Sequence, residues 1–306
     1  MHTNSPKIYF AGRSTTAANS LISETLKINP TANITFLPTP DLTSLAAYDA
    51  LAEEFLKKED KLDVLVMSAG YLTLKGREEN EEGLDRQMTI KYYGRMRLLL
   101  TLLPSLRAAA RERGDQGFKP SVLSILAAGR ENAEATRKVI DDGNLDLNKP
   151  GTFGPGSCEK VVMTSNSLAL EELSLREKNI RFAHVYPGIV VDTGIMREIP
   201  PVLRGIWNVL KPVVGAVAGA NGVDVGEGML SLLHSGGEEG GNLFLGQWDG
   251  EGKDFRKARV VGFKSQEEWD KERGELRREV WAWLGQIMGR VGSERINGLG
   301  LWSAGQ

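Results

Sequence analysis

Cysteine and histidine are scarce in this chain of 306 residues, which holds one cysteine, Cys158, and three histidines, His2, His184 and His234. A single cysteine excludes an internal disulfide framework and is typical of a reducing compartment. The histidines are spread along the chain, whereas a zinc site usually gathers its ligands at short spacings. We therefore expect neither a disulfide nor a metal site.

Excess charge and long apolar runs are also lacking. The formal net charge is -2, which leaves no basic surplus for a nucleic-acid partner. The longest apolar run, residues 205–220, is interrupted by Lys211 and Pro212 and is shorter than the roughly 20 residues of a membrane span. The opening sequence MHTNSPKIYF lacks the basic and apolar regions of a secretory signal. We expect a cytoplasmic protein without a membrane partner.

Short apolar segments alternate with amphipathic ones along most of the chain, which predicts an α/β fold with a parallel sheet. A helix is also expected in the segment after residue 154. The other predicted strands and helices lie near residues 7–11, 34–37, 62–67, 122–126, 180–186 and 242–245 (strands), and 15–26, 44–57, 83–111, 223–233 and 267–288 (helices). The polar segment 130–156 is too long for a plain connection, so we interpret it as a functional loop or a disordered insertion.

Characteristic loops follow the predicted strands. Arg13 follows the first strand in the sequence GRS, Asp41 follows the second in DLT, and Ala69-Gly70 follows the third in SAG. Lys160 lies in the helix that precedes the fifth strand, and Pro187-Gly188 ends that strand in the sequence PGIVVDT. In this order the loops and the lysine resemble the short-chain dehydrogenase/reductase family, and HVYPGIVVDTGI and SLALEEL resemble its divergent fungal, secondary-metabolism group.

The resemblance implies a Rossmann-like, doubly wound parallel sheet between two helical layers, with NADP(H) at the carboxyl ends of the strands. Arg13 would hold the 2′-phosphate, although it could also be a solvated loop charge. Asp41 would contact the adenine, and Lys160 would bind the nicotinamide ribose. The remaining expected cofactor residues are Ala69, Gly70, Pro187, Gly188 and Thr193, of which Thr193 could equally be a helix N-cap.

One part of the family pattern is missing at the start of the chain. The family begins with a central strand and a Gly-x-x-x-Gly-x-Gly turn that meets the pyrophosphate, and only six residues precede the strand at Lys7. We expect either that another segment fills this slot or, preferably, that the true protein starts upstream. The predicted domains are residues 1–250, an incomplete Rossmann-like domain, and residues 251–306, an amphipathic helix and tail.

The catalytic positions implied by the resemblance are largely altered. The family uses a tyrosine as general acid/base, helped by a lysine, a serine and an asparagine. Lys160 fits the lysine, but the tyrosine position is Gly156, and no tyrosine occurs between residues 93 and 186. The serine position is Leu126, with Ser124 two residues earlier, and the asparagine position is Lys91.

Other reactive groups are weaker candidates. We interpret Cys158 as a small packing residue rather than a reactive thiol. Asp141 and Asp142 are interpreted as a solvated pair rather than as acid/base catalysts, and Tyr92 and Tyr93 as packing residues.

Three functions remain open on the sequence. The first is an NADP(H)-dependent oxidoreductase that acts on a small carbonyl or alcohol, with Lys160 in the catalytic role. The second is an isomerase, cyclase or dehydratase that uses the same pocket without redox chemistry. The third is a pseudoenzyme that binds a nucleotide or a partner. The resemblance also implies a possible homo-oligomer through the helix at residues 83–111 and the helix that carries Lys160.

Overall fold

The computed structural model describes residues 5–39, 41–114, 117–190, 198–205, 207–208, 219–220, 225–227, 229, 243–247, 266–292, 296 and 298–302. A parallel sheet has the order β3-β4-β5-β8, with β3 at Val64–Met67, β4 at Ser121–Ile125, β5 at Arg181–Tyr186 and β8 at Leu243–Gln247. β1 (Lys7–Gly12) and β2 (Asn33–Pro38) form a separate parallel pair, and β6 (Ile189–Val190) pairs with β7 (Gly219–Ala220). The predicted α/β fold with parallel strands is confirmed.

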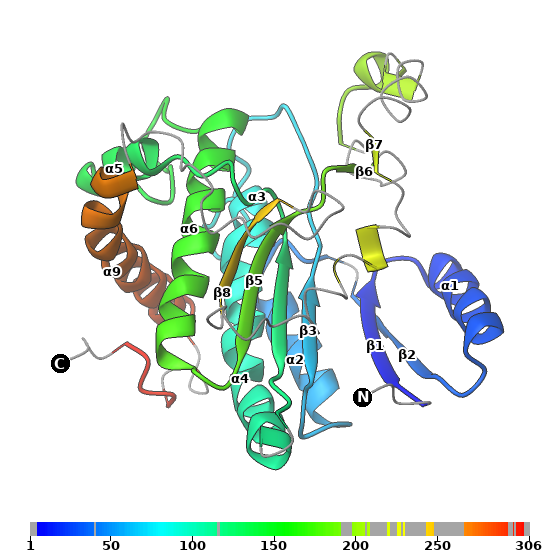
Figure 1. The fold of residues 1–306 in the computed structure, drawn as a ribbon. Coiled ribbons are helices and arrows are strands. Elements are labelled where there is room, and N and C mark those ends of the chain that lie inside the picture. The colour runs from blue at the N-terminus through cyan, green and yellow to red at the C-terminus, as the bar shows by residue number, and fades with distance from the viewer. Residues whose placement is uncertain are drawn as a thin grey trace.

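The helices connect these strands in the alternating order that the sequence predicts. They are α1 (Thr15–Ile28), α2 (Leu45–Leu56), α3 (Arg86–Met88), a π-helical turn η1 (Thr89–Tyr93), α4 (Gly94–Arg113), α5 (Ala133–Asp141), α6 (Pro155–Arg176) and α9 (Gln266–Val291). Figure 1 shows α4 and α6 side by side along the larger sheet, with α9 outside α6. No helix of the described residues is long and apolar enough to cross a membrane.

The sheet is divided between β1 and β3. These two strands neighbour each other in Figure 1, yet each pairs on one side only within the described residues. Apolar side chains at this division are unusually exposed, with exposed fractions of 38% for Ile8, 38% for Val64 and 49% for Val66.

Two expectations about local structure are corrected in part. The helix expected over residues 83–111 begins only at Arg86, because Asp85 caps it by accepting hydrogen bonds from the backbone N–H groups of Gln87 and Met88, both at 2.9 Å. The segment 130–156, interpreted as a functional loop or a disordered insertion, is not a disordered insertion, because it contains α5. The side chain of Asn132 starts this helix by accepting a hydrogen bond from the Ala135 N–H group at 2.8 Å.

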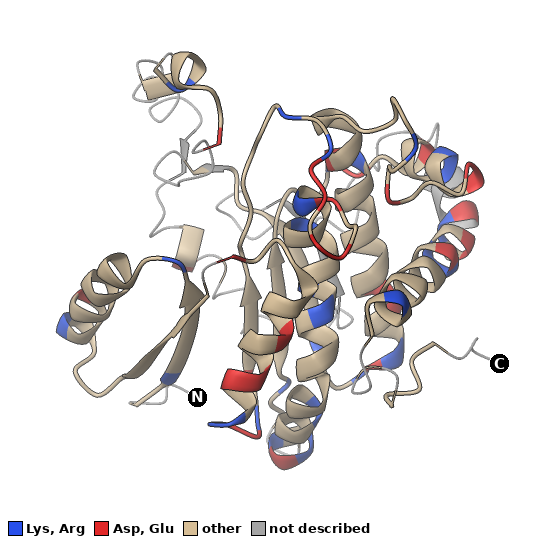
Figure 2. Cartoon of the chain, turned by 180° about the vertical axis from the view of Figure 1, so that it is seen from behind, with Lys and Arg blue, Asp and Glu red and all other residues tan. Residues whose placement is uncertain are grey.

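The core lies where α4, α6 and α9 meet. Most residues of α6 are buried, since α5, α9, β5 and η1 pack against it. Apolar residues of α9 join the same core: Leu276, Val280, Trp281, Leu284, Ile287 and Met288. Acidic and basic side chains are mixed along the rest of α9 (Figure 2). This arrangement leaves the carboxyl ends of the strands as the place where a ligand can approach.

Candidate active site

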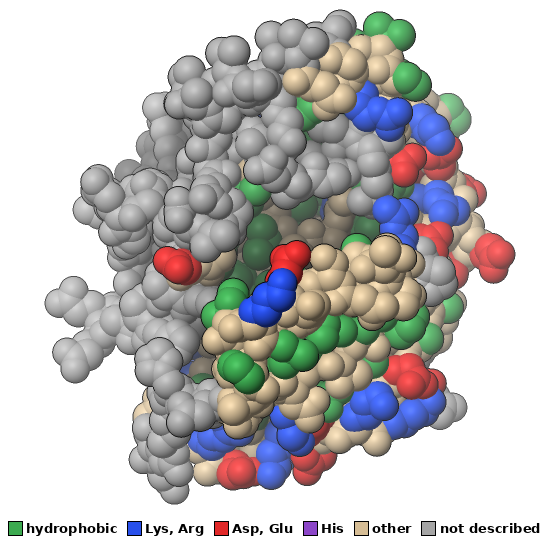
Figure 3. Space-filling model, turned by 90° about the vertical axis from the view of Figure 1, so that its right-hand side faces the viewer, with side chains coloured by type: hydrophobic (Ala, Val, Ile, Leu, Met, Phe, Trp, Pro, Cys, Tyr) green, Lys and Arg blue, Asp and Glu red, His purple; other side chains and the backbone are tan. Residues whose placement is uncertain are grey.

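A large cavity of about 1620 Å³ opens at the carboxyl ends of the strands. The loops that follow β1, β2, β3, β4 and β5 all contribute residues to its wall, and so do Glu159, Lys160 and Met163 of α6. Figure 3 shows apolar side chains gathered in a hollow on the face of the molecule that carries α1. Parallel sheets bind their ligands at this edge, so the cavity is the candidate site.

The structure brings the expected cofactor residues together around this cavity. Its lining includes seven of them: Arg13, Asp41, Ala69, Gly70, Lys160, Pro187 and Gly188. Thr193 lies outside the described residues. Gly188 has a φ of 79°, in the left-handed region where side chains are disfavoured, which explains why a glycine follows Pro187 in this turn.

Asp41 is already engaged by neighbouring groups. Its carboxylate accepts hydrogen bonds from the Thr43 N–H group at 2.9 Å and from Nη2 of Arg86 at 2.7 Å. The side chain of Asp41 remains 51% exposed, so it can still meet a ligand from the solvent side. Arg13, in contrast, forms no ion pair within the described part of the chain and is free to receive an anion.

The residue at the asparagine position, Lys91, lies in the π-helical turn η1. π-helical turns inside α-helices are frequent at functional sites. The Lys91 side chain forms an ion pair with Glu159 of α6 and donates a hydrogen bond to Gln87 Oε1 at 3.2 Å. Asn166 donates its Nδ2–H to the Lys91 carbonyl oxygen at 2.9 Å, which holds the turn against α6.

The structure also shows where the residues at the tyrosine and serine positions lie. Gly156 lies in the first turn of α6, and Leu126 follows β4 as a partly buried part of the cavity wall. Ser124 is fully buried inside β4, where its hydroxyl accepts a hydrogen bond from Arg95 Nη1 at 2.8 Å. Ser124 thus belongs to the layer beneath the cavity and does not replace the serine. Lys160 lies on the cavity wall next to Glu159.

The weaker candidate residues do not line the cavity. Cys158 is buried, and burial raises the pKa of its thiol, so it is a packing residue as interpreted from the sequence. Asp141 and Asp142 are exposed at the end of α5. Tyr92 and Tyr93 are buried in the core. Among the described residues no cluster of three or more possible metal ligands occurs.

A buried polar chain lies beneath the cavity. The Ser167 hydroxyl donates to Glu131 Oε1 at 2.5 Å and lies 2.7 Å from His184 Nδ1. Burial, together with the charge of Arg95, lowers the pKa of His184 to about 3, so its ring is neutral. Burial also raises the pKa of Glu131. These groups support the floor of the site and do not line it.

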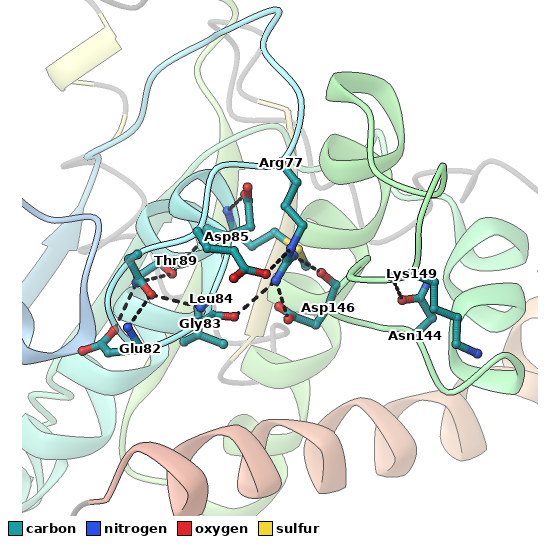
Figure 4. A network of polar contacts seen from close by, with 12 residues as sticks. Arg77, Glu82, Gly83, Leu84, Asp85, Thr89, Asn144, Asp146 and Lys149 are labelled. Carbon is teal, nitrogen blue, oxygen red and sulfur yellow. Dashed lines mark hydrogen bonds and ion pairs between the residues drawn. The ribbon is translucent and has the colours of Figure 1, made fainter.

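A second network fixes the loop between β3 and α3, part of which lines the cavity (Figure 4). Nη1 of Arg77 donates to the Asp146 carbonyl oxygen at 2.6 Å, and Nη2 donates to Asp146 Oδ2 at 2.9 Å. Glu82 in the same loop accepts from the N–H groups of Leu45 and Ala46 at 2.7 and 2.9 Å, and so caps α2. The loop is therefore held at both sides.

The residues of the cavity wall that sequence reasoning missed include Arg95 and Glu159. Arg95 follows Lys91 by one helical turn, so the spacing i, i+4 was a signal that the two side chains share a face. Glu159 stands beside Lys160 and gave no separate signal. Its pairing with Lys91 depends on how α6 packs against η1.

Comparison with known proteins finds fungal oxidoreductases among the relatives of this chain. No family model matches the chain. An oxidoreductase of Emericella nidulans is 30% identical over 76% of this chain and 64% of its own length. An oxidoreductase of Emericella variicolor is 34% identical over 63% of this chain and 53% of its own, and a short-chain dehydrogenase/reductase of Stachybotrys chartarum is 27% identical over 69% and 59%. The chain thus spans between half and two thirds of the length of these curated relatives.

One solved structure supports the fold. The active-site complex of Pseudomonas aeruginosa RhlG with NADP superposes with a TM-score of 0.50 at 17% identity, over 80% of this chain and 85% of RhlG. The fold, the relatives and the order of the strand-end loops agree. These findings support a place for the chain in a divergent short-chain dehydrogenase/reductase group with fungal members.

Proposed function

We propose that this protein is an NADP(H)-dependent oxidoreductase that acts on a small carbonyl or alcohol, in a secondary-metabolite pathway. The observation that carries the proposal is the convergence of Arg13, Asp41, Gly70, Lys160 and Gly188 on one cavity. These residues come from four different strand ends and one helix, which is the arrangement that dinucleotide recognition needs. Oxidoreductase names among the curated relatives also support it.

In this proposal each residue has a definite role toward the nucleotide, which supplies the hydride when bound. Arg13 binds the 2′-phosphate, because a guanidinium is planar, always charged and able to bind two oxygens at once. Asp41 contacts the adenine, and Lys160 binds the nicotinamide ribose. With Gly156, Leu126 and Lys91 at the tyrosine, serine and asparagine positions, the usual catalytic set is incomplete, so turnover should be slow.

Nucleotide binding tests the proposal directly. Titration of the protein with NADPH and NADH, followed by nicotinamide fluorescence, should show NADPH bound about tenfold more tightly or better. Arg13→Ala should abolish the preference, whereas Arg181→Ala, on β5 outside the cavity lining, should retain it. If neither nucleotide binds, the proposal is wrong.

A non-redox activity has one specific observation in its favour. The Lys91–Glu159 ion pair places an acid and a base on the cavity wall, and such groups can move protons in an isomerisation or dehydration. Conversion of a substrate in the complete absence of nucleotide would support this second function. Strict dependence of turnover on NADPH would exclude it. We also propose that residues 1–250 form the Rossmann-like domain and that residues 251–306 form a C-terminal amphipathic helix and tail.

A further inference from the structure

Arg95 is a buried cation on the cavity wall without an ion-pair partner among the described residues. It lies in the first turn of α4, and only 1% of the residue is exposed. Burial lowers the pKa of its guanidinium to about 10, so the group remains charged at neutral pH. The charge of Glu159 on the same wall partly opposes this lowering of the pKa, but Glu159 forms no ion pair with Arg95. A buried ion without a paired counter-charge costs several kcal/mol. Packing alone therefore does not explain why a charged arginine is buried at this position.

The hydrogen bonds of Arg95 use only part of its guanidinium. Nη1 donates to Ser124 Oγ at 2.8 Å and to the Ile125 carbonyl oxygen at 2.9 Å, and Nη2 donates to the Ala69 carbonyl oxygen at 2.8 Å. All three acceptors are neutral. A guanidinium has five N–H donors, so one Nη2–H and the Nε–H remain, and Nε is buried without a partner. Two such donors can bind a carboxylate bidentately.

The other cations of the cavity have partners or proposed roles. Lys75, Arg86 and Lys91 each form an ion pair with a carboxylate. The cations that line the cavity without an ion pair in the described ranges are Arg13, Arg95, Arg130 and Lys160. The nucleotide proposed above would engage Arg13 and Lys160, and the Arg130 guanidinium lies 4.8 Å from the centre of the Tyr186 ring. Of these four, only Arg95 has neither a proposed nucleotide contact nor an aromatic ring against it in the described part of the chain.

We propose that the end of the cavity between β3 and β4 binds the carboxylate of an organic acid, with Arg95 donating Nε–H and the remaining Nη2–H to it. Apolar side chains of the same cavity wall, including Leu126, Met163 and Met229, suit an acid with an apolar body. In naming a substrate class, this inference rests on the proposed oxidoreductase function. The binding itself needs no nucleotide.

The test compares an acid with its neutral counterpart on nucleotide-free protein. Isothermal titration calorimetry with benzoate and with benzamide, at matched ionic strength, should give at least about tenfold tighter binding of benzoate. Arg95→Gln should remove this preference. Arg130→Gln, which removes another unpaired cation of the same cavity, should retain it. Equal affinities in the unchanged protein, or a preference that survives Arg95→Gln, would overturn the inference.

Two further measurements keep the result clear. Because Arg95→Gln also removes donors to two backbone carbonyls, its fold is checked by circular dichroism. If Arg95→Gln does not fold, Arg95→Lys replaces it in the test. This variant keeps the positive charge but lacks the two parallel N–H donors, so it should lose most of the preference for benzoate. An unchanged preference in Arg95→Lys overturns the inference. NADPH titrations run in parallel: benzoate preference without NADPH binding supports the carboxylate site and refutes the proposed function, and the reverse result refutes only the carboxylate site.

Discussion

The ammonium group of Lys91 and the carboxylate of Glu159 form an ion pair that joins the π-helical turn η1 to α6 at the cavity wall. The partners differ in their access to water, because the Lys91 side chain is 2% exposed and the Glu159 side chain 29%. Gln87 gives Lys91 one additional, neutral acceptor. Only Lys91 therefore depends on its partner to compensate for lost hydration.

Removing the two partners should have unequal effects on stability. Glu159→Gln should lower the free energy of unfolding by about 3 kcal/mol, because it leaves a buried ammonium group without a counter-charge. Lys91→Met should cost only about 1 kcal/mol, since the Glu159 carboxylate can turn to water. Urea unfolding followed by circular dichroism measures both values. In the exposed pair Lys75–Glu78 the matching changes should each cost less than about 0.5 kcal/mol. Equal losses for Glu159→Gln and Lys91→Met would contradict this account.

The strands could be predicted from the sequence, because short apolar segments in an α/β chain have few other places to go. Two details could not be predicted in the same way. The π-helical turn at residues 89–93 has no signature in TIKYY, since it depends on Asn166 reaching the Lys91 carbonyl. The helix α5 did have a signal, because Asn132 precedes the amphipathic stretch AEATRKVI, but the surrounding polar residues obscured it.

The candidate site also contains residues that could be predicted from the sequence and residues that could not. Arg13, Asp41 and Gly70 could be predicted because each directly follows a strand, and parallel strands end at one edge. For Arg95 the spacing from Lys91 indicated a shared helix face, but its burial could not be predicted, since an arginine next to an apolar run is usually an exposed charge on a helix. Its burial follows from the packing of α4 beneath β3 and β4, where the carbonyl oxygens of Ala69 and Ile125 accept its hydrogen bonds.

The buried imidazole of His184 should make stability depend on pH. Its pKa is about 3 in the folded protein, because of burial and the nearby charge of Arg95, and near 6.5 when unfolded. Between these values the unfolded chain binds more protons, so the free energy of unfolding falls by about 1.4 kcal/mol per unit as pH drops below about 6.5. In His184→Gln this contribution is absent.

Urea unfolding at pH 7, 6 and 5 should therefore show a steeper loss for the unchanged protein than for His184→Gln. The raised pKa of Glu131 gives a slope of opposite sign, since the folded protein holds that proton to higher pH. Glu131 is present in both proteins, so its contribution largely cancels in the comparison. Parallel profiles would show that His184 is not held neutral.

The chain should be a monomer in solution. The family resemblance implies association through the helices that contain Lys91 and Lys160, but α9 packs along α6 and Gly292, just beyond its end, accepts a hydrogen bond from Arg97 of α4. A partner helix would have to displace α9 from this face. Size-exclusion chromatography with light scattering should give the monomer mass of 33.5 kDa. A dimer whose cross-links map to α6 would contradict the prediction.

The attachment of α9 should depend on the ion pairs of its inner face. Nε of Arg277 lies 2.9 Å from Glu172 Oε2, and Nη1 lies 3.2 Å from Glu171 Oε1; both acidic side chains are only 10% exposed. Arg277→Glu should lower the free energy of unfolding by about 3 kcal/mol or more, because it places a third acid beside two buried ones. Arg278→Glu, at the neighbouring exposed position, should change it by less than about 0.5 kcal/mol. Similar losses in both variants would argue against the inner-face contact.

The Arg77–Asp146 contact should reveal itself by a pH dependence opposite to that of His184. The Asp146 side chain is 2% exposed; burial raises the pKa of its carboxyl, and Arg77 opposes that rise. In Arg77→Met the pKa should rise further, so the folded variant holds a proton that the unfolded chain releases. Stability of the variant then falls as pH rises through this window.

Urea unfolding should accordingly show a gap between the unchanged protein and Arg77→Met that widens with pH. At pH 8 the expected loss is about 3 kcal/mol, because a buried carboxylate has lost its partner, and at pH 5 it should be clearly smaller. Arg86→Met is the matched control, since its partner Asp41 is 51% exposed and can turn to water. A gap that stays constant from pH 5 to 8 would mean that Asp146 remains charged without Arg77, held by its other hydrogen bonds alone.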